Sequence, residues 1–154
     1  MIDRLEWFKR QFNFELPIEM FPNVVERVRG MPARLEELTR GVSRQILTQR
    51  DGDKWSIQEQ AGHLLDLESL WLSRLDDFEA GREKLAAADL KNQKTHDANH
   101  NANTIENILA LFRRERMEFV RRLDRYDKEF VKRSGLHSAL EFEDSRYRSR
   151  LLCR

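Results

Sequence analysis

The stretch WSIQEQAGHLLDLE, residues 55–68, decides the fold because it carries both the start and the apolar face of a long helix. Ser56 and Glu59 have the S-x-x-E spacing of a capping box, in which each side chain satisfies a backbone N–H left free at a helix start. Apolar residues then recur every three or four positions, which is the period of one buried helical face: Ile57, Ala61, Leu64, Trp71, Leu75 and Phe78. The sequence therefore predicts a helix over residues 56–79 that stops near Gly81.

His63 lies beside this apolar face with an acid on either side. Glu59 precedes it by four residues and Asp66 follows it by three, so both carboxylates share its side of the helix. Metal sites use a neutral imidazole held by a carboxylate, and such a carboxylate can also move a proton. The alternative is a half-buried histidine hydrogen-bonded to its own helix. His63 is thus a candidate metal ligand, and Glu59 and Asp66 are candidate catalytic residues.

Two further long helices follow from the same apolar period. One covers about residues 22–39 and should be interrupted or kinked at Gly30 and Pro32, because proline removes a backbone donor and clashes with the preceding turn. The other runs from near Thr104 to about residue 132. A short amphipathic segment is expected at 3–12, and the polar stretch 86–103 is expected to be a crossover loop. The arginines of the last helix are expected to form a solvated face: Arg113, Arg114, Arg116, Arg121 and Arg122.

The composition suits a small helical protein. The chain has 154 residues, of which 36% are charged and 40% hydrophobic, and this length predicts a single domain. The net charge of +1 gives no electrostatic reason to expect a nucleic-acid partner, and no run is apolar and long enough to predict a membrane span. The single cysteine, Cys153, cannot form an internal disulfide, so we expect a cytoplasmic protein.

A second group of histidines could supply metal ligands. His96 and His100 are spaced i, i+4, which on a helix would let two imidazoles chelate one ion. Their neighbours are threonine, aspartate and asparagine, which are poor helix formers, so a solvated polar loop is the alternative.

Three segments together resemble one known family. WSIQEQAGHLLDLE looks like the signature helix of the DinB-like (YfiT-like) metalloprotein superfamily, supported by ERVRGMPARLEEL upstream and ANHNANTIENILALFRRERMEFVRRL downstream. The resemblance covers about residues 19–137, and the Asn-His-Asn stretch around His100 matches a recurrent family segment. It implies an all-α, four-helix up-down-down-up bundle, often dimeric. The single domain would span 1–154, with an N-terminal extension at 1–18 and a tail at 136–154.

The resemblance also implies chemistry. Family members bind a divalent metal, commonly zinc or nickel, on three histidines, one of which matches His63. The other two belong to an H-x-x-x-H motif on the fourth helix. Characterised relatives include thiol-dependent transferases, isomerases and hydrolases, so the expected partners are a small-molecule substrate or a thiol, and a second copy of the chain.

The tail departs from the family. No histidine follows His137, and the last residues lack an apolar helical period, so the fourth helix is expected to be short or missing. The tail is either a natural divergence or the product of a reading-frame change. Without a fourth helix, the apolar face of the third helix should be left open and favour self-association: Ile105, Ile108, Phe112, Phe119 and Leu123.

Two hypotheses of function therefore stand. The first is a DinB-like hydrolase or thiol transferase that depends on a divalent metal, with His63 and His100 as the first two ligands and His96 as a third candidate. The loss of the fourth-helix histidines would leave it inactive. The second is a metal-free helical bundle that acts as an interaction or structural protein. A complete set of metal ligands within reach of His63 would favour the first hypothesis, and its absence would favour the second.

Overall fold

The computed structural model describes residues 16–136 and 148–150. Nearly all of its regular structure is helical. In chain order the elements are the 3-10 helix η2 (Ile18–Met20), α1 (Phe21–Arg29), α2 (Met31–Thr39), α3 (Arg44–Thr48), α4 (Ile57–Asp66), α5 (Glu68–Glu79), α6 (Gln93–Asp97), the 3-10 helix η3 (His100–Ala102), α7 (Ile105–Leu123), α8 (Lys128–Val131), β1 (Ser134–Leu136) and β2 (Arg148–Arg150).

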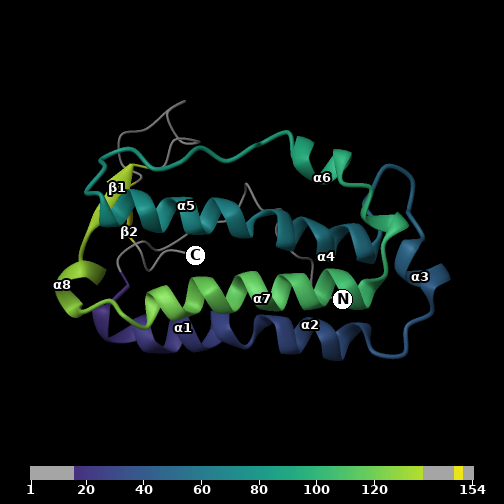
Figure 1. The fold of residues 1–154 in the computed structure, drawn as a ribbon, viewed down its shortest axis with the longest axis horizontal. Coiled ribbons are helices and arrows are strands. Elements are labelled where there is room, and N and C mark those ends of the chain that lie inside the picture. The colour runs from purple at the N-terminus through teal and green to yellow at the C-terminus, as the bar shows by residue number, and fades with distance from the viewer. Residues whose placement is uncertain (1–15, 137–147, 151–154) are drawn as a thin grey trace, which may run out of the picture.

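The described helices form three columns that lie side by side along the long axis of the molecule (Figure 1). The first column is α1 with α2, the second is α4 with α5, and the third is α7. The chain runs along the first column and back along the second, then crosses the length of the bundle again before α7 begins (Figure 1). The columns therefore follow the up-down-down order expected for the first three helices of the predicted bundle.

The first column confirms the predicted break. α1 ends at Arg29, Gly30 separates the two helices, and α2 begins at Met31. Pro32 falls in the first turn of α2, where a missing N–H costs nothing because that donor would have no helical partner. The break therefore lies where proline is tolerated.

The second column matches the helix predicted over 56–79, with one irregularity. Leu67 separates α4 from α5 but keeps helical angles of φ −74° and ψ −17°, and its N–H donates to the carbonyl of His63 at 3.1 Å. The expected burial of Ile57 is wrong, since this side chain is 44% exposed. In this first turn, Gln58 and Glu59 are buried instead, and Gln58 faces the crossover.

The third helix is shorter than predicted. Thr104 caps α7, as expected, but the helix ends at Leu123 instead of near residue 132. Asp127 then starts a separate helix, α8, by accepting a hydrogen bond from the N–H of Phe130 at 2.8 Å. Aspartate is a strong N-cap residue, so Phe130 belongs to a new helix rather than to the face of α7.

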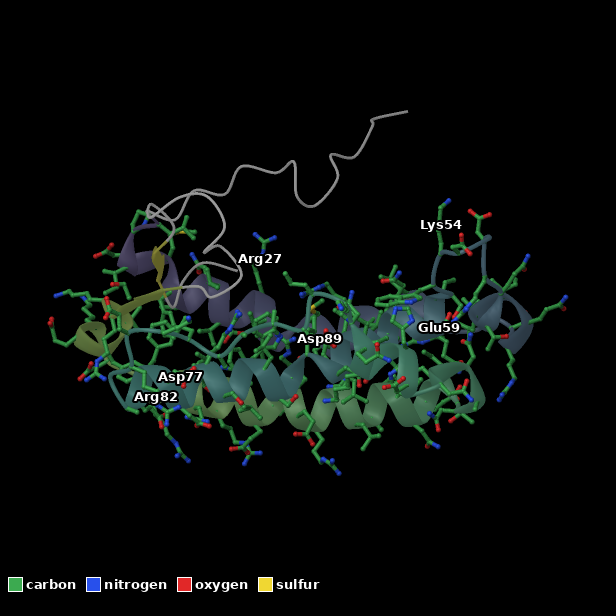
Figure 2. All side chains as sticks on the ribbon, turned by 90° about the horizontal axis from the view of Figure 1, so that it is seen from above. Arg27, Lys54, Glu59, Asp77, Arg82 and Asp89 are labelled. Atoms are coloured by element: carbon green, nitrogen blue, oxygen red, sulfur yellow. The ribbon has the colours of Figure 1, made fainter. Side chains whose placement is uncertain are left out.

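The crossover is more ordered than the loop predicted over 86–103, because it contains α6 and η3. Two buried charged residues of α5 form hydrogen bonds with the start of the crossover. Nε of Arg74 donates to the carbonyl of Ala86 at 3.0 Å, and a carboxylate oxygen of Asp77 accepts from the N–H of Ala86 at 2.6 Å. Figure 2 shows Asp77 and its ion-pair partner Arg82 near one end of the bundle, with Asp89 further along the crossover.

The core forms two clusters along α7, because this helix lies between the other two columns and contacts both. One cluster joins α7 to α3 and α4: Leu47, Ala61, Ile105, Ile108 and Leu109. The other joins it to α1 and α5: Val25, Leu75, Val120 and Leu123.

This burial contradicts the open seam expected on α7. Ile105, Ile108, Phe112 and Leu123 are each at most 7% exposed within one chain. The middle position of α7 explains the difference, since both neighbouring columns cover it. Self-association stays a prediction that rests on the family resemblance alone.

Short strands take the place of an apolar helix in the described part of the tail. Ser134, Gly135 and Leu136 pair in antiparallel fashion with Arg150, Ser149 and Arg148. The predicted amphipathic segment at 3–12 and most of the tail lie outside the described residues. None of the described helices is both long and apolar enough to cross a membrane.

Candidate functional site

The capping box predicted at the start of α4 is present. The hydroxyl of Ser56 accepts from the N–H of Glu59 at 3.1 Å, and the Glu59 carboxylate accepts from the N–H of Ser56 at 2.9 Å. Nε of Arg50 also donates to Glu59 at 2.9 Å, and this guanidinium lowers the pKa of Glu59 to about 2. Glu59, a catalytic candidate, is thus placed as a permanently ionised helix cap.

His63 is held by the crossover rather than by the acids of its own helix. Its Nδ1 lies 3.0 Å from the hydroxyl of Thr95 in α6, and its ring lies 4.9 Å from the ring of Trp55. Burial lowers the pKa of His63, opposed by the charge of Asp66 and reinforced by His100. The imidazole is therefore largely neutral at pH 7 and can offer a lone pair.

Asp66 forms a hydrogen bond with the other histidine of the site, His100. Its carboxylate lies 2.8 Å from Nε2 of His100, and both side chains are nearly buried. The ring of His100 packs directly on Gly62, where an added methyl group would lie 2.2 Å from Cγ. Nδ1 of His100 is buried with no hydrogen-bond partner in the described part of the chain. The ring is thus enclosed between η3 and α4.

Polar contacts around His100 fix the end of the crossover against α4. The buried amide of Gln58 donates to the carbonyl of His100 at 2.7 Å and to that of Asn103 at 3.0 Å. The hydroxyl of Ser56 donates to the side-chain oxygen of Asn101 at 2.8 Å. Two of these bonds go to backbone carbonyls and one to a side-chain oxygen, and together they join the start of α4 to η3.

His96 does not join the other two histidines in a common cluster. It is exposed on α6, and its ring meets the edge of Trp55 at 5.4 Å between ring centres. The helix predicted as one alternative for the His96–His100 pair is broken, because α6 ends at Asp97 and Asn99 is left-handed with φ 46°. The i, i+4 spacing therefore does not align the two rings on one helix.

A pocket of about 280 Å³ opens between the second column and the crossover. His63 lines it, His100 does not, and the wall combines apolar with polar side chains: Asp66, Leu67, Ser69, Leu70, Ser73, Ala86, Ala87, Asp89, Asn92, Lys94 and Thr95. Of the candidate site residues, His63 and Asp66 line this cavity, and Glu59, His96 and His100 are not part of its lining.

The described residues fit one part of a metal centre only. His63 offers a neutral imidazole at the pocket wall, but residues 16–136 and 148–150 contain no group of three His, Cys, Asp or Glu side chains arranged to hold an ion. A three-nitrogen centre needs two more donors.

Sequence patterns missed several residues that build the site. Thr95, Gln58 and Asn101 each form a hydrogen bond with a residue more than 30 positions away in the sequence. Local spacing does not predict such partners. Arg116 was expected on a solvated face but is buried. Its guanidinium bonds the buried carboxylate of Glu68 at 2.5 Å, with a ring of Phe112 alongside.

One solved structure similar to this chain is YfiT from Bacillus subtilis, described as "a probable metal-dependent hydrolase with an unusual four-helix bundle topology". The TM-score is 0.69 at 15% sequence identity, and the match covers 84% of this chain and 75% of that one. Likeness at this identity establishes the fold, so the predicted four-helix-bundle class is confirmed.

None of the curated proteins matches the chain. The family model of the DinB superfamily, by contrast, matches residues 27–152, which is most of the chain and includes all the histidines discussed above. The chain therefore belongs to the DinB superfamily.

Proposed function

We propose that this protein is a metal-dependent hydrolase of a small molecule, with His63 as the zinc or nickel ligand that the described residues supply. The observation that carries the proposal is the placement of His63, which is neutral, lines the pocket and has Nδ1 engaged by Thr95. Family membership and the description of YfiT as metal-dependent support the reaction class.

The remaining donors would come from the substrate or from water. His100 is enclosed, with Nε2 on Asp66, and His96 lies at the surface, so neither is placed beside His63 as a ready second ligand. Of the two candidate catalytic acids, Asp66 lines the cavity and contacts His100, whereas Glu59 is not part of the lining and is bound by Arg50.

Titration of the full chain with zinc chloride and nickel chloride, followed by calorimetry, tests the proposal. His63→Ala should abolish metal binding, because losing a direct ligand costs more than the 10–100-fold that follows the loss of an outer-shell partner. Gln60→Ala, an exposed change one turn earlier on the same helix, should leave binding unchanged. A chelator should abolish hydrolysis of p-nitrophenyl acetate by the wild-type chain.

The second candidate is a metal-free bundle that acts as an interaction or structural protein. The absence of a three-donor group among the described residues favours it. If the wild-type chain binds neither ion even at excess metal, or binds equally well without His63, the hydrolase proposal fails and this candidate replaces it. A thiol transferase would differ from a hydrolase by requiring a thiol as co-substrate.

A further inference from the structure

Thr95 lies within hydrogen-bond distance of His63, and it is only 5% exposed. A threonine hydroxyl can accept or donate a hydrogen bond, and a neutral imidazole carries a proton on only one nitrogen. If the hydroxyl accepts from Nδ1–H, Nε2 is left without a proton and keeps its lone pair. The partner of one ring nitrogen thus decides what the other can do.

The crossover segment that carries Thr95 is anchored to the second column on both sides of that residue, by Lys94 in α6 and by His100 in η3. On one side, Nζ of Lys94 donates to the carbonyl of Asp66 at 3.1 Å and to the hydroxyl of Ser69 at 3.2 Å. On the other side, His100 bonds the carboxylate of Asp66 at 2.8 Å. Thr95 is therefore held between two anchors on α4 and α5.

Left-handed residues at both ends shape this segment. Asn92 precedes α6 with φ 53°, and Asn99 follows it with φ 46°, a conformation that asparagine adopts more readily than most residues. The carboxylate of Asp89 accepts from the N–H of Gln93 at 2.5 Å, which fixes the start of the helix. The crossover thus makes two sharp changes of direction that present Thr95 to His63.

We infer that Thr95 is a positioning residue for His63, which accepts a hydrogen bond from Nδ1–H and leaves the Nε2 lone pair for a ligand in the pocket. In metal sites a carboxylate or backbone carbonyl usually accepts the hydrogen bond from the histidine N–H that does not face the metal. Here the acids nearest in sequence are committed elsewhere, Glu59 to Arg50 and Asp66 to His100. The inference rests on the proposed function only in the identity of the ligand, because the tautomer exists without one.

Long-range ¹H–¹⁵N NMR of the metal-free full chain at pH 7.5, with labelled histidine, reads the tautomer directly. The His63 signals are those lost in His63→Gln. In the wild-type chain we expect protonation at Nδ1. Thr95→Ser keeps a hydroxyl and should retain this form, whereas Thr95→Val should shift most of the population to protonation at Nε2.

Thr39→Val is the matched control, because it removes another buried hydroxyl, one that bonds its own helix at Leu35. It should leave the His63 signals unchanged. Protonation of wild-type His63 at Nε2 would overturn the inference, and so would an unchanged tautomer in Thr95→Val. If Thr95→Val does not fold, the wild-type and Thr95→Ser spectra still test the inference, because each must show His63 protonated at Nδ1.

A zinc titration separates this inference from the proposed function. Thr95→Val should weaken zinc affinity by 10–100-fold, with Thr95→Ser close to wild type. A wild-type chain with Nδ1 protonated that binds no zinc would sink the hydrolase proposal and leave the positioning role intact. A chain that binds zinc through His63 but carries the proton on Nε2 when metal-free would support the hydrolase proposal and overturn the positioning role.

Discussion

At the scale of single residues, the closest packing in the site is between Gly62 and the ring of His100. A side chain at Gly62 would collide with the ring atoms, which are themselves fixed by the bond to Asp66. Glycine is therefore required here for space, not for backbone freedom, because Gly62 lies within an ordinary helix. The close approach brings η3 directly onto α4.

Gly62→Ala should consequently destabilise the protein, although alanine is the better helix former. Overpacking a well-filled site costs about 1–3 kcal/mol, more than the gain of up to about 1 kcal/mol in helix propensity. Urea unfolding followed by circular dichroism measures the change. Gln60→Ala on the exposed side of the same helix is the control, and a Gly62→Ala protein as stable as wild type would show that η3 moves freely.

The sequence predicted the residues of the site unevenly, and distance along the chain explains why. The capping box of Ser56 and Glu59 was predictable because its bonds join residues three positions apart. His63 could be found from its place on the helix. Its partner Thr95 lies 32 residues away, and the partner of Asp66 lies 34 residues away, so neither could be inferred from local spacing.

At the scale of elements, helix caps with different surroundings can be compared. Ser56 accepts from Glu59 N–H at 3.1 Å and also donates to Asn101 of the crossover, whereas Ser43 caps the short α3 through a bond of 3.4 Å. Ser56→Ala should cost about 1–2 kcal/mol, the upper range for a lost cap. Ser43→Ala should cost less. Chemical denaturation of both variants checks the order, and equal losses would contradict it.

Elements with a sustained apolar period were predictable, and the end of α7 is the exception. α4, α5 and the start of α7 matched because caps and periodicity agree there. The end of α7 was missed because Asp127 begins a new helix within the apolar pattern. The short helices of the crossover were missed because α6 and η3 depend on left-handed asparagines and distant anchors rather than on an apolar face.

At the scale of the whole molecule, the buried pair of Glu68 and Arg116 joins the second and third columns. Burial raises the pKa of Glu68 to about 7, although the guanidinium of Arg116 acts against this shift, and one Glu68 oxygen has no partner among the described residues. A carboxyl whose folded pKa exceeds its unfolded value stabilises the fold most when protonated. Its contribution is present below the unfolded pKa of 4.5 and is lost as the pH rises through about 7.

Glu68→Gln should therefore flatten the dependence of stability on pH over this window. The wild-type chain should lose on the order of 3 kcal/mol between pH 4.5 and pH 8 from this group, at about 1.4 kcal/mol for each pKa unit. Unfolding free energies at several pH values test the effect. The exposed variant Glu129→Gln is the control, and a wild-type slope retained in Glu68→Gln would refute the assignment.

Self-association is the prediction at this scale that depends on the family rather than on exposed surface. Of the five α7 residues expected to drive it, four are buried and Phe119 is half-buried, so the expected open seam does not supply the surface. Sedimentation velocity across a hundredfold range of concentration should still show a dimer. A compact monomer throughout that range would remove the expectation.

The central place of α7 also sets the order in which the chain can assemble. Its contacts with the second column close loops such as the 48 residues between Glu68 and Arg116. Its contacts with the first column close longer ones, up to the 95 residues between Arg29 and Asp124. Longer closures cost more entropy, so the two parallel columns should meet first and α1 with α2 should dock last. Unfolding should begin where folding ends, with the first column leaving α7.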